Sequence, residues 1–275
     1  MYESFNIVNN MNGGFMKILI TGAASGIAFL TGITLKSRGH DVIMTTHTVE
    51  QLTTLNEKLQ LLKLDITTFK LDINNKKDIK LLSDFEFDVL INHAGIGLGG
   101  SIIDIDESEV ENNFKTNFFS SYNLAKYFCN RLIKEKRKGK LIITSSIAGV
   151  VPIEFLGSYC SSKAAITMMA RCLKKEVKLL SQDIDICVIE PGAYHTGFNQ
   201  VMIDSINIPS NSPFFDQESH IKNRLKFKFK LMEKKEINSI VTQIILAVEE
   251  KNPRFIYSAP LLQTIFKKLY LLLFY

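Results

Sequence analysis

Short apolar runs alternate with longer stretches of helical pattern along most of this chain. The first run, residues 16–20, reads Met-Lys-Ile-Leu-Ile, which is typical of a strand buried on both faces of a parallel sheet. Strands are predicted at residues 17–21, 41–45, 69–71, 89–92, 140–144, 184–190 and 255–257. The alternation predicts an α/β fold, a doubly wound parallel sheet of about seven strands with helices on both faces.

The same pattern indicates how the chain is organised. Residues 1–15 are rich in Asn and Gly and lack periodicity, so we expect a disordered N-terminal extension before a single domain at 16–275. Gly39 is expected to stop the first helix, and Asp106 or Ser108 to cap a helix over 110–119. Residues 197–235 interrupt the alternation, and we interpret them as a lid that binds substrate.

Composition narrows the class of protein. Of the 275 residues, 46% are hydrophobic and 22% are charged, as in packed globular proteins. The formal charge of +5 is spread along the chain, and its one short cluster, Lys134 to Lys138, is interpreted as a solvated helix end, so no nucleic-acid partner is expected. The cysteines have no metal-ligand spacing and follow no secretory signal, so we expect reduced thiols, no metal site and a cytoplasmic protein; they are Cys129, Cys160, Cys172 and Cys187.

The C-terminal tail is the one segment that bears on membranes. No run of 18 apolar residues occurs, which argues against a transmembrane helix. Residues 266–275 nevertheless end in aromatic and aliphatic side chains, with two lysines upstream. We favour packing of this tail on the body of the protein or on a partner subunit. The alternative is weak contact of the tail with a membrane surface, which would make the protein membrane-peripheral.

A glycine-rich turn follows the first predicted strand. Glycines at 22 and 26 allow a tight turn, so that a pyrophosphate can approach the backbone and face the N-terminus of the next helix. Such a turn is weak evidence alone, but the strand before it and the helix after it supply the context that it requires. A dinucleotide site is therefore predicted at Gly22, Ala24, Ser25, Gly26 and Ile27.

A second group of residues indicates chemistry. Tyr159 and Lys163 are four residues apart and project from one face of a helix. Ser146 stands thirteen residues before Tyr159, just past the carboxyl end of the fifth strand, where α/β sheets bind ligands; Ser145 is the alternative. Asn117 lies among apolar helix residues. It could belong to the same polar group as Ser146 and Tyr159, or it could simply satisfy a buried backbone group.

In this order the motifs resemble those of the classical short-chain dehydrogenases/reductases, a family with a single-domain Rossmann fold. Residues 21–28 are similar to the TGxxxGxG fingerprint, with Ala28 in place of the last glycine, and residues 92–95 to NNAG, with His93 in place of the second asparagine. Residues 191–196 resemble PGxxxT. The resemblance covers residues 16–196 and continues weakly to 252–255. It implies hydride transfer between NAD(P)(H) and a carbonyl or alcohol, by a homo-oligomer as in many relatives.

The resemblance also implies a role for each member of an Asn-Ser-Tyr-Lys tetrad. Tyr159 is the expected acid/base, and Lys163 lowers its pKa and binds the nicotinamide ribose. Ser146 holds the substrate oxygen as negative charge develops on it, and Asn117 positions water in a proton relay. A triad of Ser146 with His195 is rejected, because no acid is placed to orient His195.

Further cofactor contacts follow from the same resemblance. Asp72 and Ile73 would meet the adenine, with Asp65 as a competitor for Asp72. The cleft would be lined by Asn92, Ala94 and Gly95, and the nicotinamide carboxamide would meet Pro191, Gly192 and Thr196. His93 is interpreted as structural rather than catalytic.

The residues after the second strand bear on the choice of cofactor. Thr46 and His47 stand where an acid favours NAD and a base favours NADP, and neither is an acid. We prefer NADP, with NAD and an exposed, unengaged His47 as alternatives. The substrate is a small carbonyl or alcohol compound, and the lid aromatics Phe198, Phe214 and Phe215, with Met202, hint that it is lipophilic. A regulatory or scaffold protein that binds cofactor without turnover is the alternative function.

Overall fold

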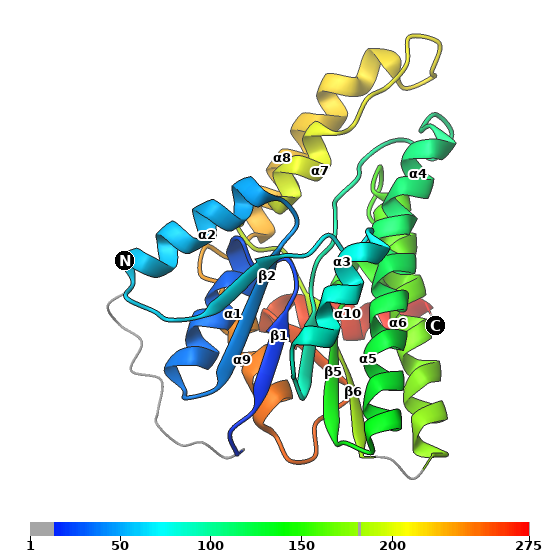
Figure 1. Cartoon of the computed structure of the whole chain (residues 1–275). Helices are drawn as coiled ribbons and strands as arrows, with labels where there is room; N and C mark the ends of the chain where they lie inside the picture. Colours follow the sequence, from blue (N-terminus) through cyan, green and yellow to red (C-terminus); the bar gives the residue numbers. More distant parts are fainter. Residues whose placement is uncertain (1–13, 181–182, 275) are drawn as a thin grey trace.

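The computed structural model describes residues 14–180 and 183–274. Thirteen of the fifteen residues in the predicted disordered extension therefore lie outside the described residues. The described chain forms one parallel sheet in the order β3-β2-β1-β4-β5-β6-β7 (Figure 1). Its strands are β1 (Lys17–Ile20), β2 (Asp41–Thr46), β3 (Thr67–Lys70), β4 (Val89–Asn92), β5 (Gly139–Thr144), β6 (Ile184–Pro191) and β7 (Ile256–Ala259).

The strand order reverses between β1 and β4, which are hydrogen-bonded neighbours. In open α/β sheets, ligands bind at such a switch point, outside the carboxyl ends of the strands. The turns that follow β1, β4, β5 and β6 all meet at this edge, and they carry most of the residues singled out from the sequence.

Helices cover both faces of the sheet (Figure 1). One apolar core lies between the sheet and three helices, α1 (Gly26–Ser37), α2 (Val49–Leu61) and α9 (Asn238–Glu249). A second core fills the other face, beneath α3 (Lys76–Lys80), η1 (Leu81–Asp84), α5 (Ser121–Glu135) and α6 (Gly157–Lys178). The predicted doubly wound α/β architecture is confirmed.

Two of the predicted helix boundaries appear in the structure. The first helix ends at Ser37 with Arg38 as its C-cap, and Gly39 follows with φ of +89°, a conformation that glycine adopts without strain. α4 (Glu107–Phe114) begins directly after Asp106. The helix expected over 110–119 differs, because α4 passes at Lys115 into a π-helical turn, η2 (Lys115–Ser120).

The segment at 197–235 forms a helical arm. It contains α7 (Phe198–Asp204), the short turn η4 (Phe215–Gln217) and α8 (Glu218–Met232), and it extends beyond the carboxyl ends of the strands (Figure 1). A third apolar cluster, which includes Tyr159, Met202 and Phe229, packs this arm onto the site. The chain then closes with α10 (Leu261–Phe274). Among the described residues, no helix combines the length and apolar character needed to cross a membrane.

Candidate functional site

The turn between β1 and α1 has the geometry of a phosphate cradle. Gly22 and Gly26 have φ of +69° and +60°, in the left-handed region that favours glycine. A Cβ on Gly22 would lie 2.9 Å from the Cα of Ala94, so the β4 turn approaches too closely for a side chain there. No side chain caps α1 at Ser25, so its first N–H groups remain for an anion. The residues present therefore fit a dinucleotide pyrophosphate.

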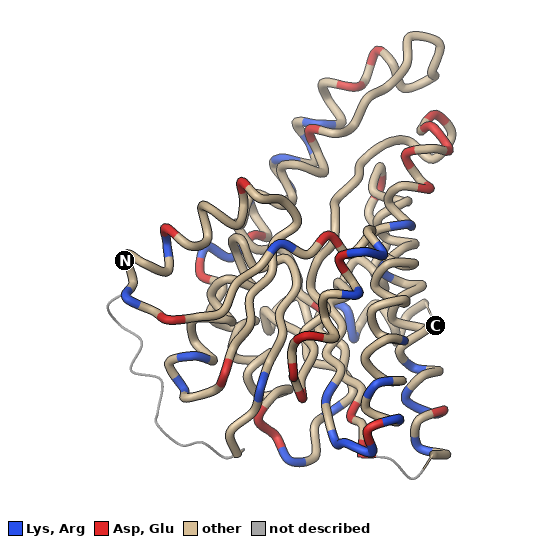
Figure 2. The backbone as a smooth tube through the Cα atoms, in the orientation of Figure 1, with Lys and Arg blue, Asp and Glu red and all other residues tan. Residues whose placement is uncertain are grey.

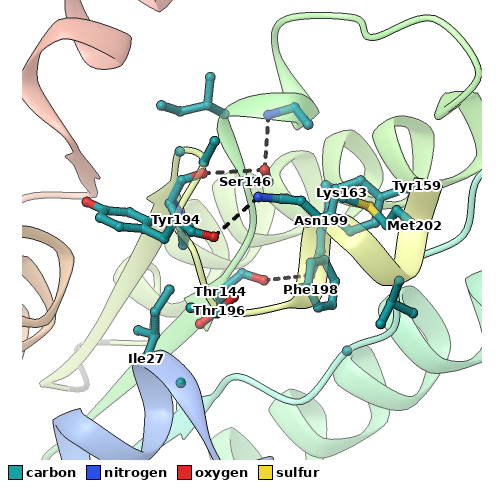
Figure 3. A pocket seen from close by; sticks show the side chains of 18 of the residues that line it. Ile27, Thr144, Ser146, Tyr159, Lys163, Tyr194, Thr196, Phe198, Asn199 and Met202 are labelled. Atoms are coloured by element: carbon teal, nitrogen blue, oxygen red, sulfur yellow. Dashed lines mark hydrogen bonds between the residues drawn. The ribbon is translucent and has the colours of Figure 1, made fainter. Parts of the chain in front are cut away.

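A cavity of about 660 Å³ extends from this turn across the carboxyl end of the sheet (Figure 3). Gly22, Ser25 and Gly26 line one end of it, and Ser146, Tyr159 and Lys163 line another part. The predicted residues Ala24, Ile27, Ala94, Gly95, Pro191, Gly192 and Thr196 also line it. The structure thus brings the glycine turn and the polar cluster into one continuous space.

The polar cluster is held by backbone contacts. Tyr159 and Lys163 project from the first turns of α6, and the Lys163 Nζ lies 5.8 Å from the centroid of the Tyr159 ring. The same Nζ donates to the Thr144 carbonyl at 3.1 Å, which fixes it beside the end of β5. The Ser146 Oγ accepts from the Ala148 N–H at 3.1 Å and donates to the Pro191 carbonyl at 3.4 Å.

Burial sets the protonation of these groups. It raises the pKa of Tyr159 to about 12, although a hydrogen bond with Ser146 acts in the opposite direction. Burial also lowers the pKa of Lys163 to about 8. The Tyr159 phenol is therefore protonated at neutral pH, and the Lys163 amine next to it changes charge at a pH only slightly above neutral. Ser145, the alternative to Ser146, instead donates to the Lys163 carbonyl at 2.9 Å and accepts from Thr167 at 2.6 Å, so both of its hydroxyl roles are used inside the protein.

Asn117 lies behind the cavity rather than on its wall. Its carboxamide accepts from the Ile96 N–H at 2.8 Å and donates to the Ile96 carbonyl at 2.9 Å. It also donates to the Ser162 hydroxyl at 3.1 Å, which joins it to α6. The π-helical turn places the amide there, and such turns frequently occur at functional sites.

The residues predicted for the adenosine end lie outside the cavity lining. Thr46 is buried in β2, where its hydroxyl donates to the Thr48 carbonyl. His47 is exposed and its Nδ1 lies 3.4 Å from the Asp72 carboxylate, so these two form one small cluster. Ile73 belongs to the apolar core. Asn92, which was predicted to line the cleft, also lies outside the cavity lining, and its side chain donates to the Ser121 carbonyl at 2.9 Å.

His93 has a definite place in the site. Its backbone N–H donates to the Thr21 hydroxyl, and its Nδ1 lies 3.0 Å from the Thr144 Oγ1. The carbonyl of that same threonine accepts from Lys163. Burial, with a smaller effect from the Lys163 charge, lowers the pKa of His93 to about 4, so the ring is neutral at neutral pH.

Several lining residues gave no signal in the sequence. Gln263 of α10 accepts from the Ala193 N–H at 2.7 Å and donates to the Met232 carbonyl at 2.8 Å. Phe266, one turn later, also lines the cavity. Both belong to a tail that carries no motif, and only the packing of α10 brings them to the site. Lys58, one of many lysines, donates to the Ala24 carbonyl at 3.1 Å beside the glycine turn.

The arm residues expected near substrate are divided between two places. Phe198 and Met202 line the cavity, and the Phe198 ring centroid lies 5.8 Å from that of Tyr159 (Figure 3). Phe214 packs instead against Phe155, with ring centroids 5.4 Å apart, and Phe215 is exposed.

One premise about His195 was wrong. An acid does orient it, because the Glu233 carboxylate lies 2.9 Å from its Nδ1. The two residues are 38 positions apart, so no local pattern pairs them. His195 is nevertheless largely exposed and does not line the cavity, so the structure does not bring it to Ser146 as a triad requires.

The arrangement suits a reaction in which an oxygen gains negative charge and a proton. Ser146 and Tyr159 are hydroxyl donors beside the Lys163 amine, and the glycine turn offers a phosphate cradle to a dinucleotide in the same cavity.

Comparisons with known proteins agree with this geometry. A family model described as short chain dehydrogenase matches residues 16–206. A 3-ketodihydrosphingosine reductase of Bacteroides thetaiotaomicron is 32% identical over 257 residues, which cover 91% of this chain and 90% of that protein. An NADPH-dependent 1-acyldihydroxyacetone phosphate reductase of Saccharomyces cerevisiae is 33% identical over 58% of this chain and 55% of its own length. A short chain dehydrogenase/reductase of Burkholderia phymatum, solved with NAD, shares the fold with a TM-score of 0.79 at 17% identity, over 93% of this chain and 92% of that one.

Proposed function

The chain belongs to the short-chain dehydrogenase/reductase family, NAD(P)-dependent oxidoreductases of carbonyl and alcohol groups, and from this premise we propose that it reduces a lipophilic ketone with NADPH. The observation that carries the proposal is the convergence of Ser146, Tyr159 and Lys163 on the cavity that also contains the glycine turn. When bound there, the nicotinamide supplies the hydride.

The protein's own residues supply the remaining chemistry. Ser146 donates a hydrogen bond to the substrate carbonyl oxygen, and Tyr159 gives that oxygen its proton as the alcohol forms. The raised pKa of Tyr159 keeps the phenol protonated at neutral pH, which suits reduction. The Lys163 ammonium beside Tyr159 favours the phenolate left behind, and we expect it also to bind the nicotinamide ribose. Asn117 would hold a proton-relay water through the backbone turn at Ile96 that it fixes.

Two basic side chains support NADP over NAD. Lys58 lies against the Ala24 carbonyl, and His47 follows β2 in a position that offers no acid of its own. An ammonium near the adenosine ribose would pair with the 2′-phosphate of NADP by a charge-assisted hydrogen bond.

The arm supports a lipophilic substrate. Phe198, Met202 and Phe229 give the cavity an apolar wall next to Tyr159. We propose that residues 197–235 close over substrate as the predicted lid and that the fold acts as a single domain. The named activity of the Bacteroides relative makes 3-ketodihydrosphingosine the first compound to assay.

A spectrophotometric assay tests the proposal. Purified protein is given NADPH or NADH with 3-ketodihydrosphingosine, medium-chain 2-ketones and short soluble ketones, and loss of the nicotinamide absorbance is followed. We expect NADPH oxidation that increases with the chain length of the ketone. Absence of turnover with every ketone, together with tight NADPH binding that Tyr159→Phe leaves unchanged, would favour a cofactor-binding regulator instead.

A further inference from the structure

The C-terminal helix α10 is inverted relative to an ordinary surface helix. Gln263 and Lys267 are four residues apart, so they share one helix face, and that face points into the protein. Lys267 is only 6% exposed, whereas Leu262 and Leu273 are 73% and 76% exposed. An ordinary surface helix buries its apolar stripe and exposes its charges. The polar face of α10 is inside and its apolar face is outside.

Polar contacts hold α10 in this orientation. The Lys267 ammonium pairs with the buried Glu190 carboxylate at the end of β6, and it donates to the Ser258 hydroxyl at 2.9 Å. Gln263 adds its two hydrogen bonds to Ala193 and Met232. A buried charge without its partner is strongly unfavourable, so these contacts specify which face of α10 turns inward.

The outer face of α10 forms a largely apolar surface, and Lys268 is the exposed charged residue on this helix. Its residues are between 44% and 81% exposed, and they are Leu261, Leu262, Ile265, Phe266, Leu269, Leu272 and Leu273. Soluble monomers rarely expose such a contiguous group of large apolar side chains, and where they do, it marks contact with a partner or a membrane.

Positive charge lies beside this face. The segment 222–235 contains seven basic residues and one acidic residue. Acidic residues outside the segment pair with four of the basic ones, which are Lys222, Arg224, Lys226 and Lys228. Among the described residues, Lys230, Lys234 and Lys235 form no ion pair, and they lie at the end of the segment that is nearer to α10. Figure 2 shows Lys and Arg positions along the arm that contains α8, with acidic positions among them. The hydrogen bond from Gln263 to the Met232 carbonyl joins the end of this segment to α10, which itself contains no acidic residue. Apolar side chains next to lysines fit an anionic lipid surface.

The apolar face also continues into the cavity. Phe266 is 58% exposed yet lines the cavity, and Met232 at 42% does the same. A second copy of the chain seated on this face would cover the cavity mouth. In a two-fold interface it would also bring two basic segments toward each other. An anionic lipid surface balances the positive charge instead of adding to it. It can also release a lipophilic compound into the cavity mouth instead of blocking it.

We propose that α10 and the end of α8 dock this protein on an anionic membrane surface, with the cavity mouth facing the lipid. Only the route of substrate from the bilayer rests on the proposed function, and the docking itself does not.

Vesicle co-sedimentation of the full chain tests the proposal. The vesicles are phosphatidylcholine alone, or phosphatidylcholine with phosphatidylserine. The variant pair Leu262→Ser and Leu273→Ser removes apolar contact but leaves Gln263, Lys267 and the cavity lining intact. The matched control pair is Leu61→Ser at the end of α2 and Leu179→Ser just after α6, which are 83% and 84% exposed. Removal of the chain after Leu262 is a poorer test, because it also deletes both anchoring residues.

We expect the wild type and the control pair to bind the phosphatidylserine vesicles. The α10 pair should bind these vesicles with an affinity at least about tenfold lower. Exchange of Lys230, Lys234 and Lys235 for Gln should lower binding only where phosphatidylserine is present, and added salt should have the same effect. Equal sedimentation of the α10 pair and the wild type would overturn the proposal.

Sedimentation velocity without lipid distinguishes docking on a membrane from association of two copies of the chain. A wild type that forms dimers and binds no vesicles, with an α10 pair that is monomeric, would show that the face joins two copies and would overturn lipid docking. Failure of the proposed function is distinguishable from either result. Vesicle binding without ketone turnover leaves docking in place, and turnover of a short soluble ketone without vesicle binding overturns docking alone.

Discussion

Tyr159 combines two roles that a single substitution separates. Its ring packs beside Phe198, and its hydroxyl is the proposed proton donor. Tyr159→Phe keeps the ring and removes the acid, so kcat/KM for ketone reduction should fall by roughly 10²- to 10⁴-fold, while NADPH still binds. Initial-rate assays measure kcat/KM, and fluorescence titration measures the binding of NADPH.

Tyr194 provides the matched control. It also lines the cavity, but its hydroxyl is paired with Ser239 at 2.7 Å. Tyr194→Phe should therefore change kcat/KM only a few-fold. A comparable loss in the two variants would contradict the assignment of the proton to Tyr159.

The pH dependence should differ between the two directions of reaction. Reduction uses the protonated phenol, which a pKa of about 12 provides, and a charged Lys163, which a pKa of about 8 provides only below that pH. We expect kcat/KM for reduction to be level below about pH 8 and to fall above it. Alcohol oxidation uses the deprotonated phenol and should rise with pH instead. Initial rates in both directions over this range measure it, and parallel profiles would contradict the roles of the two groups.

His93 should make the protein sensitive to acid. Its pKa is about 4 in the folded protein against 6.5 for the free side chain, so the unfolded chain binds the extra proton first as pH falls. The contribution of the neutral His93 ring to the free energy of unfolding is fully present above about pH 6.5, and it is lost as the pH falls toward 4. We expect a loss of roughly 2 kcal/mol, less than the full shift gives, because the ring borders an open cavity.

Urea unfolding at neutral and at mildly acidic pH tests this. His93→Asn, which places the family's usual residue there, should lose less stability between the two conditions than the wild type. His220→Asn is the control at an exposed position. An identical acid loss in the wild type and in His93→Asn would assign the sensitivity to other groups.

At the scale of elements, the sequence predicted best where one pattern continues without interruption. All seven predicted strands appear in the sheet, although β3 begins two residues earlier than predicted, at Thr67, and is only partly buried. The helix predicted over 110–119 was only partly correct, because α4 ends at Phe114 and a π-helical turn follows at Lys115–Ser120. That turn decides where Asn117 points, and the sequence identified the residue but not its contact with Ile96.

The anchoring of α10 leads to a prediction about stability. Lys267→Met should lower the free energy of unfolding by about 3 to 5 kcal/mol, because Glu190 then remains buried without its ammonium. The double variant Lys267→Met with Glu190→Gln should recover much of this loss, since no charge is left unpaired. Urea denaturation measures both. Lys268→Met, on the exposed side of the helix, is the control and should change little.

At the scale of the whole molecule, the site divides by how its residues are brought together. Ser146, Tyr159 and Lys163 were predictable because strand ends and helix starts of a parallel sheet meet at one edge. Gln263, Phe266 and Glu233 were not, because each reaches its partner through the packing of helices far apart in the chain. Lys58 was not predictable either, since it approaches the glycine turn from the third turn of α2 and no local motif marks it.

Cofactor binding should stabilise the whole fold, because the cavity joins the ends of β1, β4, β5 and β6 to the arm and to α10. At a hundredfold excess over Kd, NADPH should add about 2.7 kcal/mol and raise Tm by roughly 5 to 10 °C, with a smaller rise for NADH at the same concentration. Differential scanning fluorimetry measures the two shifts. Lys58→Met should weaken NADPH binding about tenfold and leave NADH unchanged if Lys58 meets the 2′-phosphate. An equal loss for both cofactors would instead mean that Lys58 acts by holding the Ala24 carbonyl in the turn.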